Sequence, residues 1–221
     1  MAVRNKLHYL LIHNLQITKK EAFSLLEKGN VRINGVVQNE NVFFEPTDTI
    51  CYNEQVLQEG KKIISIAFYK PRGIETTLNL EIADNLKAIL PFPEIALFPV
   101  GRLDKESEGL LLLTNDGKLY KELLHSEKVV EKEYVVEVNQ AITSFFLTKM
   151  ANGVQIMGKT TLPCRIIAIS ETVFNIILTQ GLNRQIRRMC YQLGYEVLAL
   201  KRIRIGMVEL EELEVGAFRR V

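Results

Sequence analysis

The sequence predicts an α+β protein of two domains, in which the second domain has a mixed, mainly antiparallel sheet flanked by helices. The chain has 221 residues, of which 47% are apolar and 24% charged, as expected for a globular chain long enough for two cores. Strand-like and helix-like segments follow one another without the regular alternation of a parallel sheet. A polar stretch at residues 58–62 separates a small domain, residues 1–60, from a larger one, residues 61–221.

In the first domain, cap and turn signals delimit short elements. Thr18 and Glu21 form a capping-box pattern, in which each side chain satisfies a free amide at the start of a helix. Gly29 can adopt the left-handed conformation that ends such a helix. Asn34-Gly35 is the strongest short hairpin signal. We therefore expect helices at residues 7–15 and 18–29, and strands at residues 31–33, 36–37 and 49–52.

In the second domain, apolar runs are interrupted by proline and glycine. The continuous run at residues 110–113 predicts a central strand that is buried on both faces, and the turn Asn115-Asp116-Gly117 follows it. Pro71 and Gly73 end the strand before them, and Pro91 ends a helical segment. We expect strands at residues 63–69, 110–114, 134–138, 165–169, 173–179 and 195–200, and helices at residues 82–90 and 183–193.

Composition argues against several classes of protein. The longest apolar stretches, such as residues 109–113, are far shorter than the roughly 18 residues of a membrane span. No apolar segment follows the basic residues near the N-terminus, so we expect no signal peptide. Cys51, Cys164 and Cys190 form neither a C-x-x-C pair nor a disulfide framework. We therefore expect a cytoplasmic protein that does not bind a membrane.

The net charge of +2 conceals one basic segment. Residues 1–60 contain six Lys and Arg against seven Asp and Glu, whereas residues 184–204 contain six against one. Arg184, Arg187 and Arg188 stand at a predicted helix start, where cations oppose the helix dipole. This arrangement favours a partner with phosphate groups, such as RNA, or a buried carboxylate, because arginine binds both well. A solvated helix face is the alternative interpretation.

The same predicted helix has two distinct faces. Ile186, Met189 and Cys190 recur at the spacing of a core stripe. Tyr191 falls at the spacing of the three arginines, and we therefore expect it on their face.

A charged loop at residues 101–109 leads directly into the apolar run. Functional groups sit well at such an edge, where a rigid strand holds them. Asp104 is a candidate nucleophile or general base, and Arg102 is a candidate anion contact; a turn capped by the aspartate is the alternative. Asp104, Glu106 and Glu108 could suggest a metal site, but alternating carboxylates without histidine are commonly solvated, so we expect no metal.

Tyr134 lies in a strand-like segment, residues 133–138. One interpretation is an ordinary sheet aromatic with its hydroxyl group at the rim. The other is a platform on which a nucleic-acid base stacks.

Four segments occur in the same order as in a known enzyme family. They are Lys70-Pro71-Arg72-Gly73, the segment from Gly101-Arg102-Leu103-Asp104 to Gly117, Lys132-Glu133-Tyr134, and Gly181-Leu182-Asn183-Arg184-Gln185-Ile186-Arg187-Arg188-Met189. Together they resemble the ribosomal RNA pseudouridine synthases of the RsuA/RluB/RluF type, and the last segment is most similar to the RluF branch. Residues 1–60 resemble the S4 RNA-binding domain that these enzymes carry.

The resemblance implies a catalytic role for Asp104, a contact between Tyr134 and the flipped uracil, and an ion pair between Arg187 and Asp104. It also implies that Arg102 helps to extrude the target nucleotide and that Leu200 lines the base pocket. It implies no cofactor and no metal. Further RNA contacts are expected from Arg184, Arg188, Arg202, Lys19 and Lys20.

The resemblance predicts an isomerase, an RNA pseudouridine synthase that acts as a monomer on one uridine of large-subunit (23S) ribosomal RNA or its assembly intermediate. The reaction breaks the N1–C1′ bond and rejoins the base through C5, so it needs a carboxylate beside a nucleotide taken out of its stack. Three alternatives stay open at this point. They are a small-subunit target, a non-catalytic RNA-binding or ribosome-assembly factor, and a hydrolase that uses Asp104 with a second carboxylate.

Overall fold

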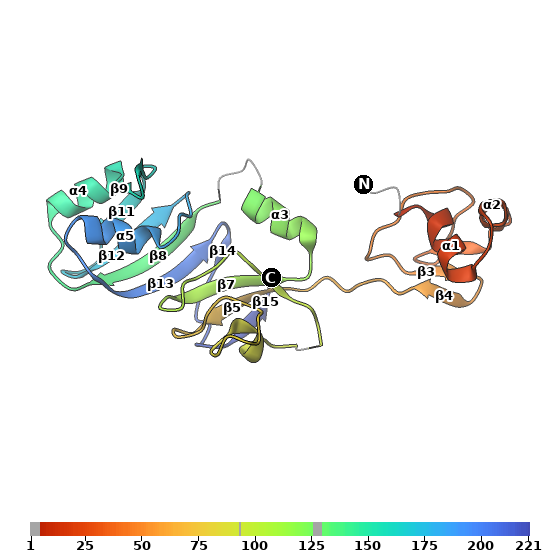
Figure 1. The fold of residues 1–221 in the computed structure, drawn as a ribbon, viewed down its shortest axis with the longest axis horizontal. Coiled ribbons are helices and arrows are strands. Elements are labelled where there is room, and N and C mark those ends of the chain that lie inside the picture. The colour runs from red at the N-terminus through yellow and green to blue at the C-terminus, as the bar shows by residue number, and fades with distance from the viewer. Residues whose placement is uncertain (1–4, 93, 126–129) are drawn as a thin grey trace. The chain divides into compact units, whose positions relative to one another are not determined.

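The computed structural model describes residues 5–92, 94–125 and 130–221, and the chain divides into two compact units, Met1–Ile63 and Ile64–Val221 (Figure 1). Each unit has a hydrophobic core of its own. None of the helices within the described residues combines the length and the apolar composition needed to cross a bilayer.

The first unit contains two helices and a four-stranded antiparallel sheet. Its elements are α1 (Leu7–Leu15), α2 (Lys19–Glu27), β1 (Val31–Ile33), β2 (Val36–Val37), β3 (Ile50–Tyr52) and β4 (Gln55–Gln58), with the strand order β2-β1-β3-β4. The predicted capping box is confirmed. Thr18 Oγ1 accepts a hydrogen bond from the backbone amide of Glu21, and the Glu21 carboxylate accepts one from the backbone amide of Thr18. Asn34 and Gly35 have φ angles of 50° and 83°, as the predicted hairpin requires. Strand β4 was not predicted, because this half-exposed strand has no apolar alternation.

The second unit is built on one large mixed sheet, which confirms the predicted α+β class. Its strands are β5 (Ser65–Lys70), β6 (Phe98–Val100), β7 (Glu108–Thr114), β8 (Lys132–Val138), β11 (Arg165–Ala168), β12 (Val173–Leu178), β13 (Val197–Ile205), β14 (Val208–Glu209) and β15 (Phe218–Arg220). The main order is β11-β12-β8-β13-β7-β5-β15, with β14 beside β13 and β6 beside β7. Among the described pairs of this sheet, β13 with β7 is parallel and the others are antiparallel. A separate hairpin joins β9 (Gln155–Ile156) and β10 (Lys159–Thr160).

Helices pack against this sheet and share its core. They are α3 (Gly117–His125), α4 (Ser144–Asn152), α5 (Gln185–Gln192) and the 3₁₀ helix η2 (Leu86–Ile89). Helices α4 and α5 lie together beside β8 and β12 (Figure 1), and one core contains Phe146 of α4, Val136 of β8 and Phe174 of β12. Ile186 and Met189 of α5 are buried in the same core. The predicted apolar face of α5 is therefore confirmed.

The structure differs from the prediction at several places in the second unit. The predicted helix at residues 82–90 is wrong, because only η2 forms there, a short 3₁₀ helix capped by the Asn85 side chain. Helices α3 and α4 and strand β6 were not predicted. For α4 the sequence does hold signals, since the Thr143 side chain caps its first turn and Gly153, with φ 98°, follows its last residue.

The parallel contact between β7 and β13 holds the charged loop that precedes β7. Gly109 lies opposite Arg202 in this pair and has a φ angle of 100°. A Cβ atom at Gly109 would lie 2.8 Å from the backbone nitrogen of Arg202 and closer still to its carbonyl oxygen. Glycine is required here both by the backbone conformation and by the close approach of the two strands.

Candidate active site

A cavity of about 380 Å³ lies in the second unit, between the loop before β7, the strands β8 and β13, and the start of α5. Six of the ten predicted site residues line it: Asp104, Tyr134, Arg102, Arg184, Leu200 and Arg202. Arg187 and Arg188 line a neighbouring groove along α5. Lys19 and Lys20 are exposed at the start of α2 in the first unit. The size of the cavity is typical of sites that bind small ligands, and hence of one that takes a single nucleotide base.

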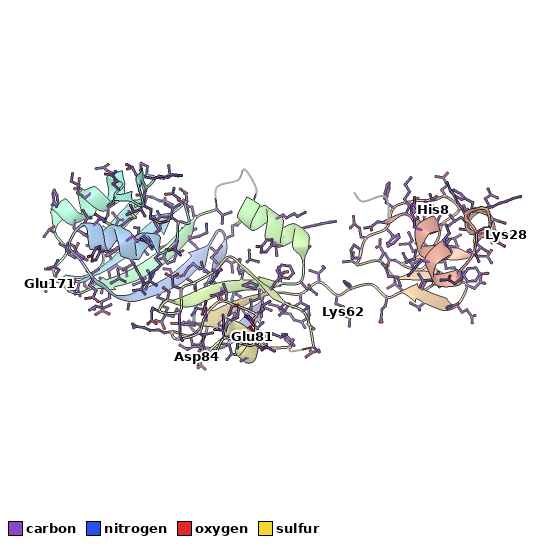
Figure 2. The ribbon with its side chains drawn as sticks, in the orientation of Figure 1. His8, Lys28, Lys62, Glu81, Asp84 and Glu171 are labelled. Carbon is purple, nitrogen blue, oxygen red and sulfur yellow. The ribbon has the colours of Figure 1, made fainter. Side chains whose placement is uncertain are left out.

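The loop that carries Asp104 is fixed by contacts on both sides of this residue. Thr76 Oγ1 donates a hydrogen bond to the carbonyl oxygen of Leu103 at 2.7 Å and accepts one from the amide of the same residue. On the other side, Lys105 forms an ion pair of 3.1 Å with Asp84, which is labelled in Figure 2. These contacts hold the Asp104 backbone at the wall of the cavity.

Among the described residues, Asp104 forms its ion pair with Arg184. The distance from Oδ2 of Asp104 to Nη1 of Arg184 is 3.9 Å. The predicted ion pair between Arg187 and Asp104 is not present, which corrects the expectation drawn from the family resemblance. Arg184 precedes α5 in the left-handed conformation, with φ 50°, so it does not continue the helical face of Arg187 as its spacing suggested.

Arg187 instead joins the charged loop to β13. Its guanidinium donates hydrogen bonds to the carbonyl oxygens of Glu106, at 3.0 Å, and Val197, at 3.1 Å. Burial and the positive charge of Arg184 lower the pKa of Arg187, whereas the negative charge of Asp104 raises it. Arg187 therefore contacts the loop that carries Asp104 and not the Asp104 carboxylate itself.

Arg202, which we expect to be an RNA contact, is buried in the wall of the cavity, so a phosphate at the surface of the protein does not meet it. Only 3% of the Arg202 surface is exposed. Its Nε donates a hydrogen bond of 2.7 Å to the carbonyl oxygen of Leu110. Its Nη2 is buried and has no hydrogen-bond partner within the described part of the chain. Burial and, to a smaller extent, the Arg202 charge lower the pKa of Lys132, which also lines the cavity. A buried cation of this kind favours a negative charge in the cavity beside it.

Tyr134 and Leu200 provide an apolar wall. Tyr134 is half-buried on β8 and pairs in register with Arg202 on β13. Leu200 is buried two residues earlier on the same strand. Arg102 is highly exposed, with 71% of its side chain accessible, and its guanidinium lies 3.7 Å from Glu75. The cavity thus combines one carboxylate, an aromatic ring, aliphatic surface and several guanidinium groups.

Lys70 belongs to one of the four family segments but is not among the predicted site residues. It is fully buried, and its Nζ donates to the carbonyl oxygens of Pro71 at 2.7 Å and Ile74 at 2.6 Å. Burial lowers the pKa of Lys70 to about 8, although the negative charges of Glu108 and Asp104 act in the opposite direction. Its burial could be anticipated only from the strand-ending position of the motif, since lysine is rarely buried.

This lysine makes the stability of the second unit depend on pH in a defined window. The folded chain releases the Lys70 proton near pH 8, whereas the unfolded chain holds it up to about pH 10.5. The free energy of unfolding, relative to Lys70→Met, should therefore rise between these values by an amount on the order of 3 kcal/mol. Urea unfolding of both proteins between pH 6 and pH 10.5 measures this difference, and a difference that stays constant contradicts the burial of a charged Lys70.

Comparison with known proteins agrees with this geometry. Residues 64–192 match the RNA pseudouridylate synthase family. The dual-specificity RNA pseudouridine synthase RluF of Escherichia coli (strain K12) is 40% identical over 204 residues, which cover 91% of this chain and 70% of that protein. The chain belongs to the RNA pseudouridine synthase family. It is therefore an isomerase, and the predicted family is confirmed.

Other pseudouridine synthases match over almost their whole length. The ribosomal small subunit pseudouridine synthase A of Vibrio cholerae is 31% identical, with 97% of this chain and 94% of that protein covered. A solved structure described as a pseudouridylate synthase superposes with a TM-score of 0.67 at 26% identity and covers 98% of this chain and 95% of its own.

Residues 5–92, 94–125 and 130–221 contain no group of three His, Cys, Asp or Glu side chains arranged to hold a metal ion.

Proposed function

We propose that this pseudouridine synthase isomerises one uridine of large-subunit ribosomal RNA and that Asp104 is its catalytic residue. The observation that carries the proposal is one cavity that brings Asp104 together with the half-buried ring of Tyr134 and the buried guanidinium of Arg202. Membership of the family supports the reaction, and the lining of the cavity supports the choice of residues.

The chemistry requires a carboxylate but no oxidant and no cofactor. The N1–C1′ bond breaks, the base turns, and a C1′–C5 bond forms. The hydrogen on C5 leaves as a proton and N1 gains a proton, so atoms and electrons balance. Asp104 acts as the nucleophile or the base at the extruded nucleotide, and Arg184 orients its carboxylate.

The other residues of the cavity hold the base. Tyr134 stacks on the uracil ring, and Leu200 supplies aliphatic surface. Arg202, buried in the wall of the cavity, favours the negative charge that develops on the base as the N1–C1′ bond breaks. Arg102, exposed at the rim, fills the space that the extruded nucleotide leaves in the RNA.

RNA phosphates meet exposed cations outside the cavity. Arg184 and Arg188 are exposed beside it, and Lys19 and Lys20 are exposed at the start of α2 in the unit that resembles an S4 domain. Such contacts set affinity and leave the choice of nucleotide to other features. We infer that the enzyme acts as a monomer, on ribosomal RNA in the cytoplasm.

The experiment is to incubate the protein with unmodified 23S and 16S ribosomal RNA and to map pseudouridine in both. We expect one modified position in 23S RNA. Modification of 16S RNA alone would assign the enzyme to the small subunit, in line with its similarity to the small-subunit enzyme. A folded, RNA-bound protein that modifies neither RNA would contradict the catalytic proposal and favour an assembly factor. Release of free uracil, or metal-dependent cleavage, would favour a hydrolase.

A further inference from the structure

A second groove, of about 470 Å³, adjoins the cavity and has no role in the reaction described above. It lies between α5, the β9–β10 hairpin and the start of β13. Arg184 lines both the groove and the Asp104 cavity, so the two adjoin at this residue. An RNA strand that delivers a uridine to Asp104 therefore has neighbouring nucleotides within reach of the groove.

The groove is positively charged. Arg184, Arg187 and Arg188 line it, against a single carboxylate, Glu196. Among the described residues, Arg188 has no ion pair, and its guanidinium donates only to the carbonyl and side-chain oxygens of Asn183. By contrast, Arg204 of the same basic segment is neutralised, since it pairs with Glu131 and Glu133 at 3.0 Å and 2.7 Å. Among the described residues, the guanidinium groups of Arg187 and Arg188 thus have no ion pair, and both line this groove.

Two large side chains are exposed in the groove beside these cations. Tyr191 on α5 is 77% exposed, and Met157, at the tip of the β9–β10 hairpin, is 63% exposed. Neither side chain contributes to the core of the unit. An accessible aromatic ring next to unpaired guanidinium groups is the combination that single-stranded nucleic acids bind, through base stacking and phosphate pairing.

We propose that the groove binds a nucleotide adjacent to the target uridine, with its base stacked on Tyr191 and its phosphate paired with Arg188. This inference rests on the proposed function, because it needs a substrate strand that enters the Asp104 cavity. It gives a role to Tyr191, which shares a helix face with Arg187 and Arg188. It also predicts that the enzyme holds an unpaired stretch of RNA on both sides of Arg184.

The test uses a synthetic RNA that spans the mapped uridine, with four variants of the full chain. Three test the stacking: Tyr191→Ala, Tyr191→Phe and the matched control Phe145→Ala, which removes a ring that is 66% exposed on α4. The fourth, Arg188→Ala, tests the phosphate contact. We expect Tyr191→Ala to raise the dissociation constant about 5- to 100-fold, Tyr191→Phe to stay within about twofold, and Phe145→Ala to have no effect. The single-turnover rate at saturating RNA should not change. Arg188→Ala should weaken binding. It should also reduce the slope of the logarithm of the binding constant against the logarithm of the salt concentration by about one, the value of one phosphate contact.

RNAs with an abasic nucleotide immediately 5′ or 3′ of the uridine decide whether a base stacks there. We expect wild type to bind one of these two abasic RNAs as weakly as Tyr191→Ala binds the intact RNA. Tyr191→Ala should bind that abasic RNA no more weakly still, because the stacking contact is already lost. If Tyr191→Ala binds every RNA as Phe145→Ala does, the groove proposal is wrong and the proposed function stands. If polyglutamate and oligouridylate compete equally well with the RNA for binding, the groove proposal is overturned in favour of an acidic peptide. If wild type forms no pseudouridine, the proposed function fails and the groove proposal fails with it.

Discussion

Replacing Asp104 with Asn should abolish pseudouridine formation while the protein still binds its RNA. The amide keeps the shape of the side chain but can act neither as a nucleophile nor as a base toward the extruded nucleotide. We expect the single-turnover rate to fall at least about 10⁴-fold, and the dissociation constant to change by less than about threefold, as for loss of a group used only in the reaction. Mapping of pseudouridine after incubation with excess enzyme measures the first quantity, and filter binding measures the second.

A matched control comes from the same loop. Glu106 is also a carboxylate, but its side chain is half-exposed and pairs with Arg72, at 3.7 Å, outside the cavity lining. Glu106→Gln should therefore keep its rate within a few-fold of wild type, since exposed ion pairs contribute little. If Asp104→Asn stays active, or if both variants lose activity equally, the catalytic role does not belong to Asp104 alone.

Replacing Gly109 with Ala should destabilise the second unit by about 3 kcal/mol or more. The added methyl group would meet the backbone of Arg202, which cannot move aside without breaking the parallel contact of β7 with β13. The left-handed φ angle of 100° adds strain of its own. Urea unfolding followed by circular dichroism measures the loss.

Gly73→Ala separates the two causes. Gly73 also has a left-handed φ, 87°, but a Cβ built there meets no atom within 4 Å. We therefore expect only the conformational cost at this position, about 1–2 kcal/mol. Equal losses in the two variants would show that the close approach at Gly109 has no energetic weight.

Elements with strong local signals could be predicted from the sequence. The capping box at Thr18 and the turn at Asn34-Gly35 specify backbone geometry within a few residues, and both are present. The apolar run at residues 110–113 could only be a buried strand or a short buried helix segment, and its length favoured the strand that forms. Only a short 3₁₀ helix forms where a helix was expected at residues 82–90. The helical spacing of apolar residues is weak there, and proline and tertiary packing determine the conformation instead.

The site could be predicted as a set of residues but not as a set of contacts. Asp104, Tyr134 and Leu200 do line one cavity. Helical spacing placed Arg184 and Arg187 on one face, yet the left-handed backbone of Arg184 removes it from the helix. Arg202 was likewise expected to contact RNA, whereas its position on a central strand buries it in the wall of the cavity. Which group an arginine contacts depends on how elements far apart in the chain are aligned in the fold. A single sequence carries no signal for that alignment.

The most direct test that the Asp104 cavity isomerises uridine uses RNA labelled with tritium at C5 of its uridines. Because the new glycosidic bond forms at C5, each turnover must release one C5 hydrogen to water. We expect wild type to release tritium in step with pseudouridine formation, with the RNA chain intact and no free uracil, and Asp104→Asn to release none. Release of uracil, or tritium release that is unchanged in Asp104→Asn, would contradict the role assigned to this cavity.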